Sequence, residues 1–253
     1  MQRKKRCYIG SILLLFLCIL TGCTLGSGKQ KENKKADYYI GVVKQNSPYY
    51  YEDKDGVSKG YYADILSALS KKYSFSYMFV PVSMSSYEQC LLEESIDGFI
   101  GNTVGEMGKE KDFYESESFF SSNLCILVPE NSEIANLKQM KNQVVVTESG
   151  SEEEVFAKYI SNKYKAQAVT FSSMDQAVSD IKNGYSQAIV VDEEYYKSNE
   201  DMFKNWTLLK KTKNFQNTHT LVARKNGKLQ DIFSKGLTEL RKSGELETIL
   251  IQK

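Results

Sequence analysis

Histidine and arginine are scarce in this chain, and their scarcity limits the chemistry that it can perform. His219 is the single histidine among 253 residues, and no group of histidine, cysteine and carboxylate residues has the spacing of a metal site. Arg224 and Arg241, both near the C-terminus, are the only arginines beyond the N-terminal segment. The charge is nearly balanced, with 33 basic and 32 acidic residues. We therefore expect no metal, no cofactor and no nucleic-acid partner.

The loop GFIGNTVGEMGKEKDF, residues 98–113, lacks the phosphate-binding pattern that its glycines suggest. A P-loop requires Gly-x4-Gly-Lys followed by Ser or Thr, whereas Gly108-Lys109 is followed by Glu110. A glycine-rich loop that follows an apolar strand still suits a small anion or a polar ligand. We therefore expect a ligand-binding loop here and exclude a nucleotide loop.

The apolar run from Cys7 to Leu20 is too short for a comfortable membrane span, which needs about 20 residues. It follows four basic residues, an order that is typical of a secretory signal. The letters LTGC at residues 20–23 resemble the lipobox of bacterial lipoproteins, in which the cysteine is diacylated and becomes the mature N-terminus. We expect residues 1–22 to be a lipoprotein signal peptide and Cys23 to be the lipidation site. An uncleaved anchor helix is the alternative.

The segment after the lipobox has almost no apolar content and several lysines. Residues 23–37 are therefore expected to form a flexible tether, with the folded part beginning near Tyr38. Removal of the signal would leave 29 of the 33 basic residues against 32 acidic ones, which makes the mature protein slightly acidic. Nothing in this balance favours nucleic acid.

Two cysteines, Cys90 and Cys125, would remain in the folded part of the mature chain. Both lie in apolar periodic segments, so we expect them to be buried small hydrophobic residues. A disulfide between them is the alternative. Neither position favours a reactive thiolate.

Apolar segments that predict strands alternate with amphipathic helical patterns, which is typical of an α/β fold with a mainly parallel sheet. Residues 38–43 and 75–82 are two of the expected strands. Helical spacing between them places four residues on one helix face: Tyr62, Ile65, Leu66 and Leu69. A C-terminal helix with an apolar stripe from Leu229 to Leu240 is expected to stop at Ser243-Gly244.

Residues 85–100 and 172–191 share one order of features. Each has Ser-Ser as an expected N-cap, an acid-Gln pair that opens a helix, and an apolar strand at the far end. One copy lies in each half of the chain, which predicts two lobes of similar construction. Chance is the alternative for so short a match.

The order and spacing of several segments resemble the family 3 extracellular solute-binding proteins, the receptors of polar amino acid ABC importers. The resemblance extends from about Tyr38 to Lys253 and rests on SPYYYEDKDGVSKGYYADIL, IDGFIGNTV, KDFYESESFF, VVVTESGSEEEVF, AIVVDEEYY and LVARKNGKLQDIFSKGLTELRKSGELETI. It implies a two-lobed, periplasmic-binding-protein-like fold of type II, with two hinge strands near residues 123–128 and 218–222 and ligand held between the lobes. Lobe 1 would comprise residues 38–124 plus 220–253, and lobe 2 residues 125–219.

The resemblance also implies ligand contacts from both lobes. Asn102 and Thr103 match positions of the glycine-rich loop that contact ligand through backbone and hydroxyl groups. The family arginine that grips an α-carboxylate is missing, because Gly108 lies near its place. Lys109 or Lys111 would have to substitute for it, with solvated loop lysines as the alternative.

Across the cleft, the amides around Gly150 and Ser151 match the point where the family receives the same carboxylate. Three glutamates, Glu152, Glu153 and Glu154, fill the helical turn that follows. We interpret them as partners of the helix dipole that would also repel an anion. An acidic ligand is therefore not expected.

Asp192 matches the aspartate that receives the ligand's ammonium group, with capping of the next helix as the alternative. Tyr49 is expected to line the cleft, and Asn46 and Met84 occupy places where aromatic rings often stack on the ligand in this family. His219 lies in the second hinge strand and is expected to be packed or to face the ligand. Two further matches, Asp64 and Asp112, are expected to be structural.

These residues predict a monomeric lipoprotein on the outer face of the bacterial cytoplasmic membrane. It would bind a small amine-bearing solute, an amino acid or a derivative, and deliver it to an ABC permease. One alternative is a sensor or adaptor on the same fold that has lost transport. A secreted hydrolase or dehydratase is a weaker alternative, because a single histidine leaves little general acid or base. We expect no enzyme.

Overall fold

Two long strands, β7 (Phe120–Pro129) and β11 (Trp206–Arg224), lie side by side at the centre of a nine-stranded sheet in this computed structural model. The structure describes residues 36–44, 46–103 and 111–251. The expected signal peptide and Cys23 lie outside these residues. Within them, no helix is both long and apolar enough to cross a membrane.

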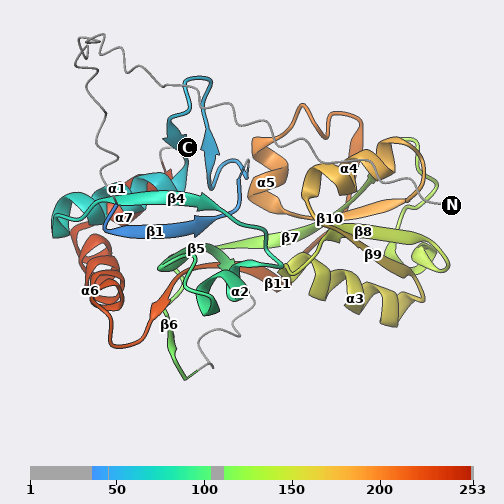
Figure 1. Ribbon diagram of the computed structural model, residues 1–253. Helices are drawn as coiled ribbons and strands as arrows, with labels where there is room; N and C mark the ends of the chain where they lie inside the picture. The colour runs from blue at the N-terminus through green and yellow to red at the C-terminus, as the bar shows by residue number, and fades with distance from the viewer. Residues whose placement is uncertain (1–35, 45, 104–110, 252–253) are drawn as a thin grey trace, which may run out of the picture. The chain divides into compact units, whose positions relative to one another are not determined.

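The sheet has the order β4-β1-β5-β11-β7-β10-β8-β9, and β6 pairs with β11 (Figure 1). The remaining strands are β1 (Tyr38–Val42), β4 (Tyr77–Pro81), β5 (Gly98–Thr103), β6 (Phe113–Glu115), β8 (Val144–Glu148), β9 (Gln167–Phe171) and β10 (Ala188–Asp192), while β2 (Tyr51–Glu52) and β3 (Ser58–Lys59) form a separate hairpin. The helices are α1 (Tyr61–Tyr73), α2 (Tyr87–Leu92), α3 (Glu152–Tyr164), α4 (Met174–Lys182), α5 (Glu193–Ser198), α6 (Lys228–Ser243) and α7 (Glu245–Ile251), with a 3-10 turn η2 at Leu137–Met140.

The two ends of the sheet repeat one strand order, which agrees with the internal repeat expected from the sequence. On one side β1 lies between β4 and β5, and on the other β8 lies between β9 and β10, all in parallel pairs. Each repeat contributes a helix and then a strand, α2 with β5 and α4 with β10. The Ser-Ser caps differ, because Ser173 accepts a hydrogen bond from the amide of Gln176 whereas Ser86 makes no side-chain cap.

The prediction of a mainly parallel sheet is wrong at its centre. The strand β7 is antiparallel to β10 and β11, and β11 is antiparallel to β5 and β6 as well. The chain leaves one half of the sheet along β7 and returns along β11, so these two strands must run in opposite directions. The result is a mixed sheet with parallel outer strands and an antiparallel centre.

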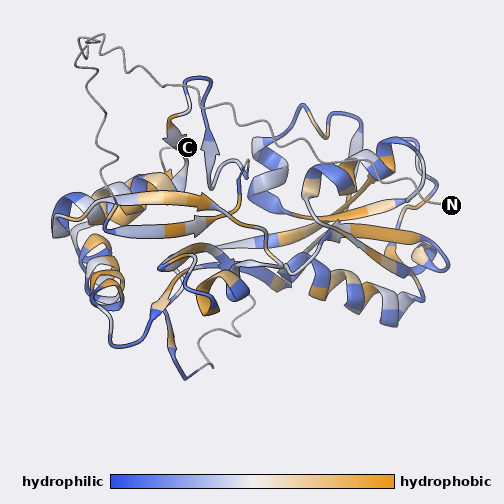
Figure 2. Cartoon of the chain, viewed as in Figure 1, coloured by the Kyte–Doolittle hydropathy of each residue, from blue (hydrophilic) through white to orange (hydrophobic). Residues whose placement is uncertain are grey.

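Alternation along the strands builds a hydrophobic cluster on each face of each half of the sheet. In β7, Leu124, Ile126 and Val128 pack toward α3, whereas Cys125 and Leu127 pack toward α4 and α5. The other half buries Ile40 and Ile100 beneath α1 and α6, and Phe99 beneath α2. Figure 2 shows apolar strands covered by helices whose outer faces are hydrophilic. The helical patterns expected for α1 and α6 are confirmed, and α6 ends at Gly244 in the left-handed conformation.

The expected lobe boundaries fall inside β7 and β11, and these strands continue through them without a break. The described residues pack as one compact unit. The division at residues 124/125 and 219/220 therefore stays a prediction. Cys90 packs with the α2 cluster and Cys125 with the α4 cluster, and no disulfide joins them.

Candidate functional site

A cavity of about 30 Å³, enough for about one water molecule, lies between the two halves of the sheet. Several of the predicted ligand residues line it: Asn46, Tyr49, Met84, Asn102, Ser151, Asp192 and His219. Five further residues complete the lining: Glu148, Glu153, Met174, Tyr195 and Asn217. The structure thus brings together residues from seven separate segments of the chain.

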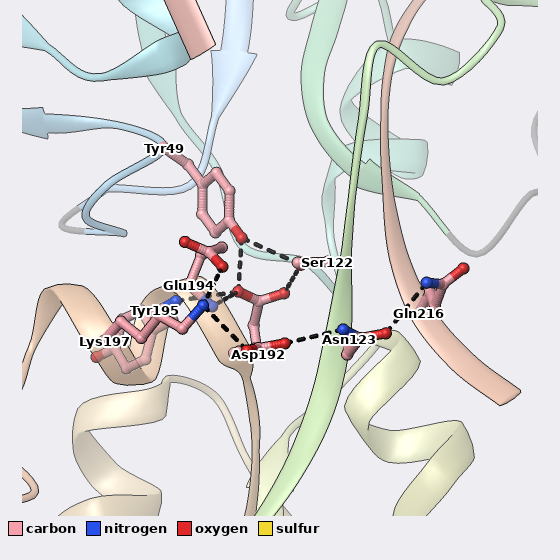
Figure 3. Close-up of polar contacts among 9 residues, drawn as sticks. Tyr49, Ser122, Asn123, Asp192, Glu194, Tyr195, Lys197 and Gln216 are labelled. Atoms are coloured by element: carbon pink, nitrogen blue, oxygen red, sulfur yellow. Dashed lines mark hydrogen bonds and ion pairs between the residues drawn. The ribbon is translucent and has the colours of Figure 1, made fainter. Parts of the chain in front are cut away.

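Asp192 lies at the end of β10, where it caps the next helix, and its carboxyl group also lines the cavity. As the N-cap of α5, its Oδ1 accepts hydrogen bonds from the amides of Glu194 at 2.9 Å and Tyr195 at 3.0 Å. The same oxygen accepts from the Tyr49 hydroxyl at 2.5 Å, as Figure 3 shows. Oδ2 accepts from Asn217 Nδ2 at 3.0 Å and from the Ser122 hydroxyl. Burial raises the pKa of this carboxyl group, although its hydrogen bonds favour the charged form.

Charged side chains of helix α5 form a second set of polar contacts, which Figure 3 shows beside Asp192. Lys197 forms ion pairs with Glu193 at 3.0 Å and Glu194 at 2.9 Å. Glu193 in turn accepts a hydrogen bond from Asn123 Nδ2 on β7 at 2.8 Å. These contacts fix the start of α5 against the central strands, and so hold Asp192 in place.

Tyr49 reaches the cavity because the start of α1 holds its backbone. The amides of Tyr61 and Tyr62 donate to the carbonyls of Pro48 and Tyr49 at 3.2 and 3.0 Å. Gly60 permits this approach, because a Cβ atom there would lie 2.4 Å from the Tyr49 carbonyl oxygen. The Tyr49 ring then stacks on His219 with centroids 4.3 Å apart.

The prediction that all three glutamates at the start of α3 are helix-dipole partners is wrong for Glu153. Its side chain is 5% exposed and faces the cavity, where Oε1 accepts from Asn217 Nδ2 at 2.8 Å. Oε2 has no hydrogen-bond partner among the described residues. Burial, with a contribution from the charge of Asp192, raises the pKa of Glu153 to about 7. Glu154 does behave as expected, because it accepts from the amide of Gly150 at 2.7 Å.

Glu148, at the end of β8, adds a third carboxyl group to the cavity. Burial raises its pKa to about 8, with further contributions from Glu153 and Asp175. The rule that ligand groups lie at the carboxyl ends of parallel strands would have identified Glu148. Helical periodicity would have identified Glu153, since it shares its face with Phe156, Ala157 and Ile160.

His219 is enclosed by aromatic rings. Its Nδ1 lies 2.6 Å from the Tyr62 hydroxyl, whereas Nε2 has no partner in the described part of the chain. Burial lowers the pKa of His219 to about 3, so the ring is neutral at physiological pH. The imidazole therefore contributes no positive charge to the cavity.

Two further predicted ligand residues, Thr103 and Gly150, are not among those that line the cavity. Thr103 donates to Glu115 and lies 3.1 Å from the Thr220 hydroxyl, which directs it into β11 and β6. The Gly150 amide is occupied by Glu154. Lys111 is exposed, and Lys109 lies outside the described residues.

Backbone and side-chain contacts close the cavity between its two walls. Gly150 has a φ of 81°, and a Cβ atom there would lie 2.9 Å from the carbonyl atoms of Met84. Asn102 Nδ2 donates to Asn217 Oδ1 at 3.4 Å. Asn199 Nδ2 donates to the carbonyl of Ser47 at 3.2 Å. Entry of any solute larger than water requires these contacts to separate.

A family model and curated relatives match most of the chain. The family model of bacterial extracellular solute-binding proteins, family 3, matches residues 38–252. The arginine-binding extracellular protein ArtP of Bacillus subtilis (strain 168) is 25% identical over 245 residues, covering 94% of each chain. The glutamate/aspartate import solute-binding protein of Escherichia coli (strain K12) is 20% identical over 234 residues, covering 88% of this chain and 78% of the relative.

Solved structures share the fold. An ancestral arginine-binding protein bound to arginine superposes with a TM-score of 0.72 at 24% identity, covering 84% of this chain and 95% of that one. The substrate binding protein of an amino acid ABC transporter gives a TM-score of 0.75 at 20% identity, covering 84% and 96%. The two-lobed, periplasmic-binding-protein-like fold expected from the sequence is confirmed.

Proposed function

Because this chain belongs to the bacterial extracellular solute-binding proteins, family 3, we propose that it binds a small amine-bearing solute in the cavity around Asp192. The observation that carries this proposal is the buried Asp192 carboxylate, which four hydrogen-bond donors besides the Ser122 hydroxyl already hold in one orientation. An ammonium group that replaces the Tyr49 hydroxyl would gain a charge-assisted hydrogen bond in a site shielded from water. Tyr49 and Met84 supply apolar walls.

The lining of the cavity argues against recognition of a carboxylate. No lysine or arginine is among the described residues that line it, and it holds three carboxyl groups, Glu148, Glu153 and Asp192. The curated relatives are named for arginine and for glutamate or aspartate, all of which carry an α-carboxylate. We propose that the solute of this chain needs an amine and does not need a free α-carboxylate, as in an amino acid amide or an amine.

Calorimetry of the wild type and of Asp192→Asn tests this proposal. The substitution keeps a side-chain oxygen that can cap α5 but removes the charge, so amine affinity should fall by thirtyfold or more, equivalent to about 2 to 5 kcal/mol. The panel contains amines, amino acid amides, free amino acids and glutamate at matched size. Asp231→Asn, on the exposed face of α6, changes the net charge equally and should leave affinity unchanged. Tight binding of glutamate that survives Asp192→Asn would overturn the proposal.

We further propose that the protein is anchored through Cys23 on the outer face of the cytoplasmic membrane and delivers its solute to an ABC permease. Two acyl chains at about 0.8 kcal/mol for each buried methylene would hold it stably. Cys23→Ala should therefore move the protein from the detergent phase to the aqueous phase in detergent partitioning. Equal partitioning of the two proteins would contradict the anchor.

A sensor or adaptor is the second candidate, and the cavity without a described arginine or lysine favours it. Copurification with a permease after crosslinking in membranes supports the importer, and failure to find one supports the sensor. An enzyme would consume the solute, whereas a binding protein would not. We therefore expect the solute to raise the Tm stoichiometrically and reversibly, without turnover.

A further inference from the structure

The two buried carboxyl groups of the cavity, Asp192 and Glu153, differ in how many hydrogen bonds they accept. Asp192 accepts from two backbone amides, Tyr49, Ser122 and Asn217, so both of its oxygens are satisfied. Glu153, although buried, receives one donor at Oε1 and none at Oε2 among the described residues. A buried carboxylate oxygen without a donor costs free energy until a donor arrives.

One amide nitrogen is shared between the two carboxyl groups. Asn217 Nδ2 lies 3.0 Å from Asp192 Oδ2 and 2.8 Å from Glu153 Oε1, so the two acceptors face the same small space. The unpartnered Nε2 of His219 lines the same cavity, and it can only accept when Nδ1 carries the proton. The cavity therefore presents an unpartnered acceptor at Glu153 Oε2, and a second one at His219 Nε2 in the tautomer that carries the proton on Nδ1.

The described lysines near the cavity do not donate a hydrogen bond to Glu153, because each is paired with another carboxylate. Lys44 lines a neighbouring hollow with Glu148 and Asp175, but its Nζ forms an ion pair with Glu52 at 3.1 Å. Lys158 and Lys197 are committed to Glu154 and to the start of α5. No described lysine or arginine lines the cavity, so a cationic partner for the ionised form of Glu153 would come from the solute.

We infer that the solute carries a second cationic group, which binds at Glu153, so that the ligand class is a small aliphatic diamine without a carboxylate. This inference rests on the proposed function, because the first amine is assigned to Asp192. Met84 and Met174 line the cavity and offer flexible apolar surface to a methylene spacer. The site thus reverses the charge expected at the α3 start, where the resemblance placed a carboxylate.

Diamine binding must also release protons. The pKa values of Glu153 and Glu148, raised by burial to about 7 and about 8, leave both groups partly protonated in the unliganded protein at neutral pH. The groups that face them are Asp192, Asp175, Tyr49, Tyr195, His219 and, at the margin, Lys44. A bound ammonium favours the carboxylate form and lowers these pKa values.

Isothermal titration calorimetry of the full chain in detergent can test this with three probes of one length. These are 1,4-diaminobutane, 1-aminopentane and 5-aminopentanoate, in which the second end is an ammonium, a methyl or a carboxylate group. We expect 1,4-diaminobutane to bind at least about tenfold tighter than 1-aminopentane, and 5-aminopentanoate to bind most weakly. Titration at pH 7 in two buffers of different ionisation enthalpy should show net proton release for the diamine only.

Two variants separate this inference from the function on which it rests. Glu153→Gln should abolish the preference for the diamine and the proton release while keeping 1-aminopentane affinity within a few fold, and Glu152→Gln should change neither. Asp192→Asn should weaken both amines. Equal binding of the diamine and the monoamine by the wild type, with loss of both in Asp192→Asn, would overturn the inference and leave the proposed function standing. Binding of neither amine would overturn both.

Discussion

Replacing Glu153 by glutamine should stabilise the unliganded protein at alkaline pH. Burial raises the pKa of this carboxyl group from 4.5 to about 7, so the folded protein holds a proton that the unfolded chain has released. A raised carboxyl pKa gives stability that is fully present below 4.5, and this stability is lost as the pH rises to about 7. At about 1.4 kcal/mol for each pKa unit, the loss for the wild type amounts to about 3 kcal/mol.

Glutamine has nearly the same shape and keeps an oxygen for Asn217 Nδ2, but it has no proton to lose. Urea unfolding of the full chain is measured at pH 5, 6, 7 and 8. The free energy of unfolding of Glu153→Gln should rise relative to that of the wild type as the pH rises. The gain should approach about 3 kcal/mol at pH 8, or about 6 to 12 °C in Tm for a domain of this size. Glu152→Gln, in the same helical turn but only half-buried, provides the matched control; burial raises the pKa of Glu152 as well, and this variant should gain less than Glu153→Gln. Parallel pH curves for Glu153→Gln and the wild type would refute the assignment of a raised pKa to this group.

Three further substitutions test the geometry of the site. Gly150→Ala should hold the two walls of the cavity apart, because its Cβ would meet the Met84 carbonyl at 2.9 Å; a larger radius of gyration in X-ray scattering is expected, and an unchanged profile would count against the contact. Ser151→Ala removes the hydroxyl that caps the amide of Glu154 and should cost about 1 kcal/mol in urea unfolding, whereas Ser151→Gly should cost only a few tenths. Tyr62→Phe leaves the buried Nδ1 of His219 without its partner at 2.6 Å and should cost about 1 to 3 kcal/mol; a neutral effect would show that another group replaces the hydroxyl.

Helical periodicity in the sequence was sufficient to place α1 and α6. Their apolar residues recur every three or four positions, and the structure buries Ile65, Leu66 and Leu69 in α1 and Ile232 and Phe233 in α6. The strand ending at Asp192 was likewise apparent, because a buried apolar run gives way to a carboxylate. These features depend on residues close in the chain.

The same local rule also holds at the start of α3, where charge and spacing point to different roles for Glu153. Its charge suggested a solvated dipole partner, whereas its spacing from Phe156 and Ile160 places it on the buried face. The direction of the central strands does not follow from the sequence pattern, since a parallel and an antiparallel strand can have the same apolar pattern. Direction follows from how the chain crosses between the halves, which no single segment records.

The sequence by itself determined the family, the alternation of strands and helices, and the carboxylate at the end of β10. Only the tertiary structure decided which groups meet. Tyr49 and Asp192 are separated by 143 positions, and Asn217 and Glu153 by 64, yet each pair forms a hydrogen bond. Local patterns fix helices and strands because neighbours in the chain are neighbours in space. The hydrogen-bond deficit at Glu153 arises from the simultaneous packing of β8, α3, β10 and β11, and it exists only once they are assembled.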